Sequence, residues 1–212
     1  MNYQNLKYIY HPSTVQASYT LLLLHGTGGN ETDLLPLAER FGKNVNILSV
    51  RGNVSEHGMP RFFKRLGMGI FDEEDLAYRT EELVRFLSAV AKKENFDATK
   101  VIALGYSNGA NIAGSVLVKH PDLLVGAILF RPMQPYKELP NFNAKNAVPV
   151  FLSSGKLDPT VDSNSTESYV KKLNAGGFVT TAINLNTSHN LTQEDITQAS
   201  RWFNENFSAG NI

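Results

Sequence analysis

Hydrophobic residues along the chain fall into short continuous runs that alternate with longer stretches of three- and four-residue spacing. Runs that are hydrophobic almost throughout are typical of strands in a sheet covered on both faces. The predicted strands are Thr20–Leu24, Val45–Val50, Lys100–Leu104, Val125–Phe130, Val148–Ser153 and Phe178–Ile183. A further strand or hairpin is expected within Leu6–Ala17.

The stretches between these runs have the spacing of helices with one buried face. The predicted helices are Thr32–Phe41, Glu73–Glu94, Asn108–His120, Ser165–Asn174 and Thr192–Phe207. Asp72 and Asp75 resemble the two ends of a capping box for the longest of them. Strands that alternate with helices through short connections predict an α/β fold, with a mostly parallel central sheet and helices on both faces.

One segment, Arg51–Phe71, does not follow this alternation. It contains four glycines and a proline among its aromatic and charged residues. A long segment of this kind in a compact domain is often a functional loop. The rest of the chain has no repeat or linker, so a single domain over residues 1–212 with little or no cap is expected.

Composition excludes several classes of function. The 20 basic and 20 acidic residues cancel, which gives no electrostatic reason to expect binding to nucleic acid or a charged membrane surface. Cysteine is absent, which excludes disulfides, thiolate catalysis and cysteine-zinc sites. No apolar run approaches the roughly 20 residues of a membrane span. Residues Met1–Asn5 lack the features of a signal peptide, so a cytoplasmic location is expected.

The strongest chemical motif is Gly105-Tyr106-Ser107-Asn108-Gly109, which fits G-x-S-x-G between a predicted strand and a predicted helix. A serine on so sharp a turn needs small residues two positions away on each side, and glycine is present at both. The first amides of the following helix would favour an oxyanion at the same point. The alternative is a glycine-flanked turn with an exposed serine, but the strand-turn-helix context favours a nucleophile.

A serine nucleophile needs a nearby base, and the chain has five histidines. His189 follows the last predicted strand and therefore lies at the carboxyl edge of the sheet, where ligands of α/β proteins bind. The other four lie at the start of the fold, after the first central strand, in the long segment and at a helix end: His11, His25, His57 and His120. We predict that His189 is the base, although a loop histidine bonded only to backbone is the alternative.

The base must be held in one tautomer by an acceptor. Asp158 follows Val148–Ser153 at another strand end and is succeeded by Pro159, which fixes the turn. Asp162 is a competitor four residues further on, and Asp158 could instead cap a turn. With Asp158 as the acid, the chain order is Ser, Asp, His, which is the order of α/β-hydrolases.

The loop His25-Gly26-Thr27-Gly28-Gly29 follows the first central strand and would provide a backbone amide opposite Ser107. A dinucleotide-binding loop is excluded because G-x-G-x-x-G fails at Glu31. The N–H groups of Thr27 and Asn108 are therefore the predicted oxyanion hole, with a flexible glycine turn as the alternative. His25 is expected to shape this loop rather than to take part in chemistry.

Together these motifs resemble the phospholipase/carboxylesterase family of α/β-hydrolases over nearly the whole chain. Within it, the segments Arg51-Gly52-Asn53, Met59-Pro60-Arg61-Phe62-Phe63 and Phe71-Asp72-Glu73-Glu74-Asp75-Leu76 resemble the MhqD/YvaK-type bacterial carboxylesterases, which are associated with quinone and catechol stress. The resemblance implies a serine carboxylesterase that hydrolyses small esters through an acyl-enzyme and needs no metal or cofactor. It also implies a possible homodimer. The sequence departs from the family pattern at Phe130-Arg131-Pro132-Met133, where less positive charge is expected.

Four residues of the long segment are predicted to wall the substrate pocket: Met59, Phe62, Phe63 and Phe71. Packing of the loop onto the domain is an equally favoured interpretation. Arg51 and Arg131 also follow strands at the functional edge, and Arg131 is included in the predicted pocket. Either arginine could meet an anionic substrate group or form an ion pair with Glu56 or Asp72, and pairing is favoured.

Three other functions remain open at this point. An acyl-thioesterase or a lysophospholipase-like hydrolase would use the same chemistry. A non-catalytic binding protein on the same scaffold is a third possibility, because fold alone does not determine function.

Overall fold

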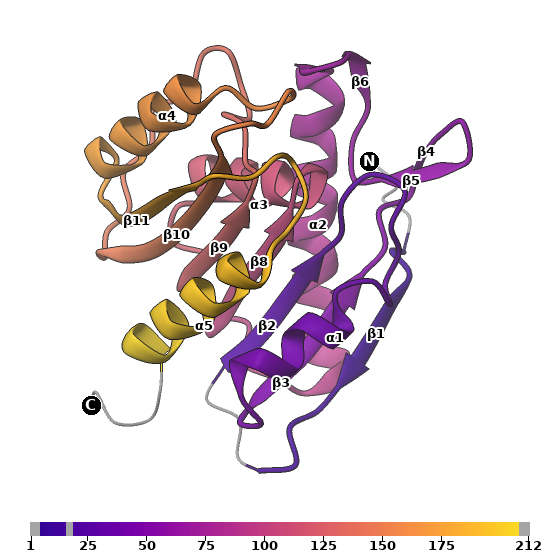
Figure 1. Cartoon of the computed structure of the whole chain (residues 1–212). Helices are drawn as coiled ribbons and strands as arrows, with labels where there is room; N and C mark the ends of the chain where they lie inside the picture. Colours follow the sequence, from indigo (N-terminus) through magenta and orange to yellow (C-terminus); the bar gives the residue numbers. More distant parts are fainter. Residues whose placement is uncertain (1–4, 16–18, 208–212) are drawn as a thin grey trace.

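The computed structural model describes residues 5–15 and 19–207 (Figure 1). The strands are β1 (Tyr8–His11), β2 (Tyr19–Leu24), β3 (Val45–Val50), β4 (Val54–Glu56), β5 (Met59–Arg61), β6 (Arg65–Gly67), β7 (Ile70–Phe71), β8 (Val101–Tyr106), β9 (Gly126–Phe130), β10 (Val148–Gly155) and β11 (Phe178–Leu185). The helices are α1 (Leu35–Ala38), the 3-10 helix η1 (Glu39–Phe41), α2 (Glu73–Glu94), α3 (Asn108–Lys119), α4 (Ser163–Ala175) and α5 (Gln193–Phe207).

Seven strands of the described residues form one sheet in the order β1-β3-β2-β8-β9-β10-β11. All neighbouring pairs are parallel except β1 with β3, which is antiparallel. Every residue of β9 is buried, and β2 and β8 are buried except at one end, which explains their uninterrupted hydrophobic runs. The mostly parallel central sheet predicted from the sequence is confirmed.

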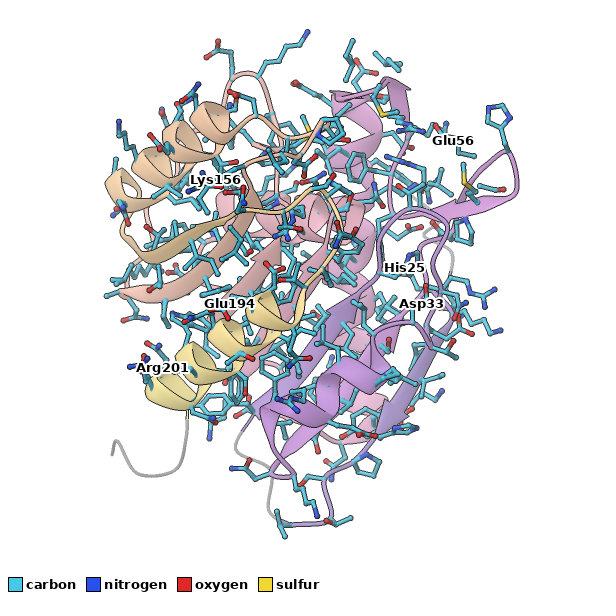
Figure 2. The ribbon with its side chains drawn as sticks, in the orientation of Figure 1. His25, Asp33, Glu56, Lys156, Glu194 and Arg201 are labelled. Carbon is cyan, nitrogen blue, oxygen red and sulfur yellow. The ribbon has the colours of Figure 1, made fainter. Side chains whose placement is uncertain are left out.

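Helices cover both faces of the sheet. Buried side chains of α2, α3 and α4 gather in one hydrophobic cluster, and those of α1, η1 and α5 gather in a second cluster with the opposite faces of the same strands. In Figure 1, α1 and α5 lie on the near side of the sheet and α2 and α3 on the far side. Glu194 and Arg201 project from the exposed side of α5 (Figure 2).

The predicted helix Thr32–Phe41 is shorter in the structure, where it is reduced to α1 and η1. The side chain of Asn30 accepts hydrogen bonds from the backbone N–H and the hydroxyl of Thr32, at 2.7 and 2.6 Å. These local hydrogen bonds hold the chain in a turn, so the helix begins only at Leu35. The predicted early strand within Leu6–Ala17 is β1, and the end of that range lies outside the described residues.

The long segment Arg51–Phe71 folds, within its described residues, into two small antiparallel ribbons, β4–β5 and β6–β7. The capping box predicted after it forms only in part. Asp72 accepts from the backbone N–H of Asp75, but the Asp75 carboxylate accepts from the backbone N–H of Lys64. The ribbons border the carboxyl ends of the strands, and no separate helical cap is present in the parts of the chain described here.

Among residues 5–15 and 19–207, no helix combines the length and the hydrophobicity that crossing a lipid bilayer requires.

Candidate active site

Ser107 occupies the turn between β8 and α3 with a positive φ of 51°. A Cβ on Gly105 would lie 2.5 Å from the carbonyl carbon of Gly109, and a Cβ on Gly109 would collide with the carbonyl oxygen of Leu24. Glycine is therefore the residue that fits at both positions. The backbone N–H of Ser107 donates to the carbonyl of Phe130 at 2.9 Å, so the strained turn is fixed to the end of β9.

Ser107, His189 and Asp158 are hydrogen-bonded in series. The distance from His189 Nε2 to Ser107 Oγ is 2.9 Å, and the distance from His189 Nδ1 to Asp158 Oδ2 is 2.7 Å. Because an ionised carboxylate only accepts, Nδ1 carries the proton and Nε2 is free to accept from the serine hydroxyl. The structure therefore brings together three side chains that are 31 to 82 residues apart in the chain.

The carboxylate of Asp158 is also held through Oδ1, the oxygen that does not face His189. Its Oδ1 accepts from the backbone N–H groups of Thr160 and Val161 at 2.8 and 3.1 Å, and the side chain is fully buried. The competing residue Asp162 instead caps α4 by accepting from the backbone N–H of Ser165. The imidazole of His189 remains 26% exposed, which leaves it open to a substrate.

Thr27 and Asn108 both line the cavity that contains Ser107. Asn108 is the first residue of α3, and the first N–H groups of a helix have no partner within the helix. The Asn108 side chain accepts from the backbone N–H of Phe62 at 2.7 Å, and Arg61 donates to the Thr27 hydroxyl at 2.6 Å. These contacts fix both residues of the predicted oxyanion hole.

His25 shapes the loop that contains Thr27 (Figure 2). Its Nδ1 lies 2.6 Å from the carbonyl oxygen of Gly26, and its Nε2 accepts from the backbone N–H of Gly52 at 3.0 Å. The neutral ring satisfies both contacts, and burial lowers the pKa of His25 below its usual value, against the opposing effect of the Gly26 hydrogen bond.

The predicted pocket residues divide into two groups. Phe71 and Arg131 line the cavity at Ser107. Phe62 and Phe63 do not, because they are fully buried in the core against His25 and Phe71. Met59 lies on β5 near Gly28 and is exposed.

Both arginines that follow strands are ion-paired, but not with the acidic residues proposed from the sequence. Arg131 pairs with Asp195, and Arg51 pairs with Glu31. Glu56 is instead the partner of Arg61 and Arg65. Asp72 is occupied as a helix cap. Pairing between distant segments leaves no periodic trace in a sequence, which is why the partners were missed.

Tyr106 and Asp195 are contacts of the site to which sequence reasoning assigned no role. The Tyr106 hydroxyl donates to the carbonyl oxygen of His189 at 3.1 Å. Asp195 lies three residues after Thr192, and the two exchange capping-box hydrogen bonds at the start of α5. The Thr-x-x-Asp pattern is the signal that would have identified Asp195 as a capping residue.

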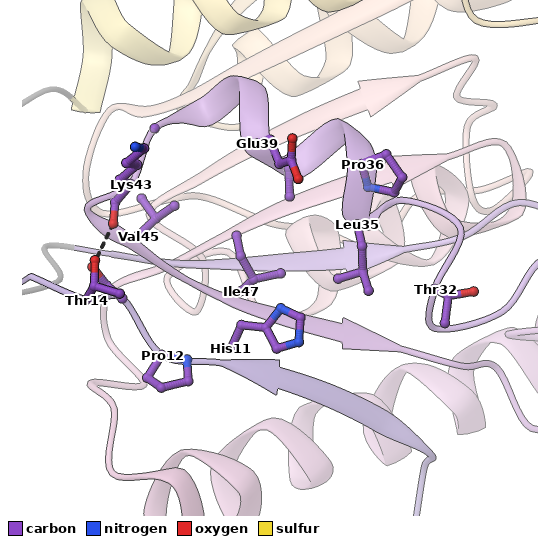
Figure 3. A pocket seen from close by; sticks show the side chains of 13 residues that line it. His11, Pro12, Thr14, Thr32, Leu35, Pro36, Glu39, Lys43, Val45 and Ile47 are labelled. Atoms are coloured by element: carbon purple, nitrogen blue, oxygen red, sulfur yellow. Dashed lines mark hydrogen bonds between the residues drawn. The ribbon is translucent and has the colours of Figure 1, made fainter.

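A larger hollow than the cavity at Ser107 lies elsewhere among the described residues (Figure 3). This groove of about 960 Å³ lies between the end of β1, the start of β3 and the short α1. It is lined by Leu35, Pro36, Val45 and Ile47, with Glu39 and Lys43 at its edge. This groove shares no lining residue with the cavity at Ser107.

A parallel sheet that carries a serine, a histidine and an aspartate in hydrogen-bonded series at the carboxyl ends of its strands defines an α/β-hydrolase. Residues 8–206 match the Phospholipase/Carboxylesterase family, and the chain belongs to that family and is accordingly a hydrolase. The family resemblance inferred from the motifs is confirmed.

The chain is 45% identical, over 202 residues, to a protein of Bacillus subtilis (strain 168) named as a provisional hydrolase, MhqD; the match covers 94% of this chain and 98% of that protein. The crystal structure of a Bacillus cereus carboxylesterase superposes with a TM-score of 0.92 at 44% identity and covers 95% of both chains. A carboxylesterase of Mesorhizobium loti superposes with a TM-score of 0.87 at 26% identity, over 93% of this chain and 94% of that one.

Proposed function

We propose that the protein is a serine carboxylesterase that hydrolyses small carboxylic esters through an acyl-enzyme. Ser107 attacks the ester carbonyl carbon while His189 Nε2 takes the hydroxyl proton. His189 then gives this proton to the leaving alcohol, and a water molecule activated by the same imidazole releases the acid. The observation that carries the proposal is the 2.9 Å and 2.7 Å hydrogen bonds that join Ser107, His189 and Asp158.

Asp158 has the role of holding His189 in the tautomer that accepts at Nε2 and of stabilising the imidazolium that forms. Its two hydrogen bonds from backbone N–H groups keep the carboxylate in place during this change. The amides of Thr27 and Asn108 stabilise the oxyanion of the tetrahedral intermediate. Loss of such a donor costs roughly 3–4 kcal/mol of barrier in other serine hydrolases.

The shape of the site supports a short acyl group. The cavity at Ser107 has a volume of about 40 Å³. A neighbouring hollow of about 260 Å³ shares Gly69, Phe71 and Met133 with it. It is lined further by Ile70, Pro135 and Tyr136, and by the polar residues Glu73, Gln134 and Lys137. We therefore place the smaller group of the ester next to Ser107 and the larger apolar group in this hollow.

The test is hydrolysis of p-nitrophenyl acetate by the wild type and by Ser107→Ala. We expect the variant to lose at least about 10³-fold in kcat. An organophosphonate should attach to the wild type in a 1:1 ratio and leave the variant unlabelled. Ser88→Ala is the matched control, because Ser88 is exposed on α2 and bonds only to the carbonyl of Val84. Wild-type turnover by Ser107→Ala would refute the nucleophile.

A further inference from the structure

His189 lies in the connection between β11 and α5, and side chains from other elements hold its backbone on both sides. Arg131 Nε donates to the carbonyl oxygen of Ser188 at 3.2 Å, and Arg131 Nη2 donates to that of Asn190 at 2.8 Å. The hydroxyl of Tyr106 donates to the carbonyl oxygen of His189 itself at 3.1 Å. Three successive carbonyl groups are thus each bound by a side chain that comes from the end of β8 or β9.

The guanidinium of Arg131 is itself fixed. Its Nη1 and Nη2 donate to the two carboxylate oxygens of Asp195, both at 2.8 Å, and Nη1 also donates to Ser153 Oγ at 2.7 Å. The Arg131 and Asp195 side chains are both 0% exposed. A bidentate pair of this kind has one geometry, and its charges cancel, so Arg131 presents no free charge to an anionic substrate.

The backbone at Arg131 is also unusual. Its φ is 55°, a left-handed conformation that costs free energy for any residue with a side chain. The backbone N–H of Arg131 donates to the carbonyl of Ser153 at 2.7 Å, so β10 holds the turn in place. This conformation carries the side chain from the end of β9 toward the segment that contains His189.

The same two strand ends hold the nucleophile. Ser107 is adjacent to Tyr106 in the chain, and its backbone N–H donates to the carbonyl of Phe130, the residue before Arg131. The distance between Ser107 and His189 is therefore set by the central sheet and not by a free loop. Because displacement of a reacting group by about 1 Å can cost about 10²-fold in rate, a device that fixes this distance bears on turnover.

We propose that Arg131 and Tyr106 are positioning residues that hold the backbone of His189 so that its Nε2 faces Ser107 Oγ. This inference rests on the proposed function. Neither side chain forms or breaks a bond in the reaction. Arg131 clamps the carbonyls that flank His189, and Tyr106 fixes the one between them while its ring packs beside the imidazole, with ring centroids 5.7 Å apart.

The experiment compares Tyr106→Phe and Arg131→Lys with the wild type in p-nitrophenyl acetate hydrolysis. Tyr106→Phe removes one hydrogen bond and keeps the ring. Arg131→Lys keeps the charge opposite Asp195, but an ammonium lacks the planar fork that reaches Ser188 and Asn190 together. We expect kcat to fall roughly 10- to 100-fold in each variant, with KM changed less than about twofold. Phosphonate labelling of Ser107 should slow by the same factor as kcat.

Matched controls separate positioning from folding. Tyr8→Phe removes a tyrosine hydroxyl that is hydrogen-bonded to Glu94. Arg79→Lys alters an arginine of α2 that donates hydrogen bonds to Asn53 and Glu82. Both controls should keep the wild-type kcat, and thermal unfolding should show Tyr106→Phe folded at the assay temperature. Rescue by the conservative substitution is tested by comparing Arg131→Lys with Arg131→Met. Arg131→Met should lose more activity, because it also removes the cation that pairs with Asp195.

The inference is overturned if folded Tyr106→Phe turns over at the wild-type rate, and this variant decides the matter even if the Arg131 variants do not fold. It is also overturned if the variants raise KM and leave kcat and labelling unchanged. A failure of the proposed function has a different signature, since Ser107→Ala would then be as active as the wild type.

Discussion

At the scale of single residues, His25 links the pH of the solution to the stability of the fold. Both ring nitrogens are engaged by the neutral form, with the Gly26 carbonyl and the Gly52 N–H as partners. Protonation would turn the acceptor Nε2 into a second donor and place it against the N–H of Gly52. Burial also lowers the pKa of His25, because the charged ring is poorly solvated there.

The consequence is a loss of stability on mild acidification. The unfolded chain takes up the His25 proton at a pH of about 6.5, whereas the folded protein does so only at a lower pH. The free energy of unfolding should therefore decrease as the pH falls below about 6.5. In His25→Gln this part of the decrease should be absent between about pH 6.5 and 5, as measured by urea denaturation. The exposed His57→Gln is the control, and an unchanged slope in His25→Gln would contradict the assignment.

The carboxylate of Glu31 affects the stability of the fold in a separate, more acidic pH range. Burial opposes ionisation of Glu31, but hydrogen bonds from Lys7 and Arg51 outweigh it and lower the pKa of Glu31 to about 2. The stability that this carboxylate contributes is present above its ordinary pKa of 4.5 and is lost as the pH falls toward 2. Measurements above pH 5 therefore keep the effect of Glu31 apart from that of His25.

Residues of the site differ in how far a sequence predicts them. That Ser107, Asp158 and His189 lie close together can be predicted, because each comes within a few residues of the end of a strand and parallel strands end at one edge of the sheet. The role of Arg131 cannot, because it depends on Asp195, a partner 64 residues away that only the folded chain brings close. A buried pair is chosen by three-dimensional proximity, and neither spacing nor composition records it.

At the scale of elements, the junction of β8 and α3 depends on close approach of backbone to backbone. A methyl group on Gly105 would lie within 2.5 Å of the Gly109 carbonyl group and 2.6 Å of the Ala110 nitrogen. Such overlap is relieved only by moving the start of α3 away from the end of β8. That movement would displace Ser107 and the N–H of Asn108 together.

We therefore expect Gly105→Ala to destabilise the protein by about 1–3 kcal/mol or more and to remove most esterase activity. Thermal unfolding and p-nitrophenyl acetate turnover measure the two effects. Gly67→Ala is the control for stability, because its Cβ would meet only Ile70 at an ordinary 3.7 Å. A Gly105→Ala variant with wild-type stability and turnover would show that the junction is not tightly packed.

Element boundaries show the limit of prediction from periodicity. The buried strands and α2 can be predicted closely, because their hydrophobic patterns are long and regular. The helix expected at Thr32–Phe41 is mostly a turn, since the hydrogen bonds of the Asn30 side chain override the pattern. The ribbons β4–β5 and β6–β7 cannot be predicted from spacing, because strands of two or three residues are too short to show a period.

At the scale of the whole molecule, one sheet supports two hydrophobic clusters. Alternate residues of β2 contribute to opposite clusters: Leu22 and Leu24 pack with α2 and α3, and Leu21 and Leu23 pack on the side of α1 and α5. Neither cluster can lose its strands without exposing the other. The single domain expected from the sequence therefore implies that both clusters unfold together.

Trp202 allows this to be tested, because it is the only tryptophan in the sequence. It lies on α5 in the second cluster, beside Phe151 and Phe207. Leu87 lies on α2 in the first cluster, across the sheet, and is buried. We expect Leu87→Ala to destabilise the protein by about 2–5 kcal/mol. If the sheet couples the clusters, the denaturation midpoint seen by Trp202 fluorescence should shift as far as the midpoint seen by far-ultraviolet circular dichroism.

The control is Val179→Ala, which also shortens a hydrophobic side chain but at an exposed position of β11. Its effect should stay within about 0.5 kcal/mol. Separate units would give a different result, because Leu87→Ala would then lower the circular dichroism midpoint and leave the Trp202 transition in place. Since β2 and β8 supply buried side chains to both clusters, a cavity on one face weakens the layer on which the other face packs, and the two probes should report one transition.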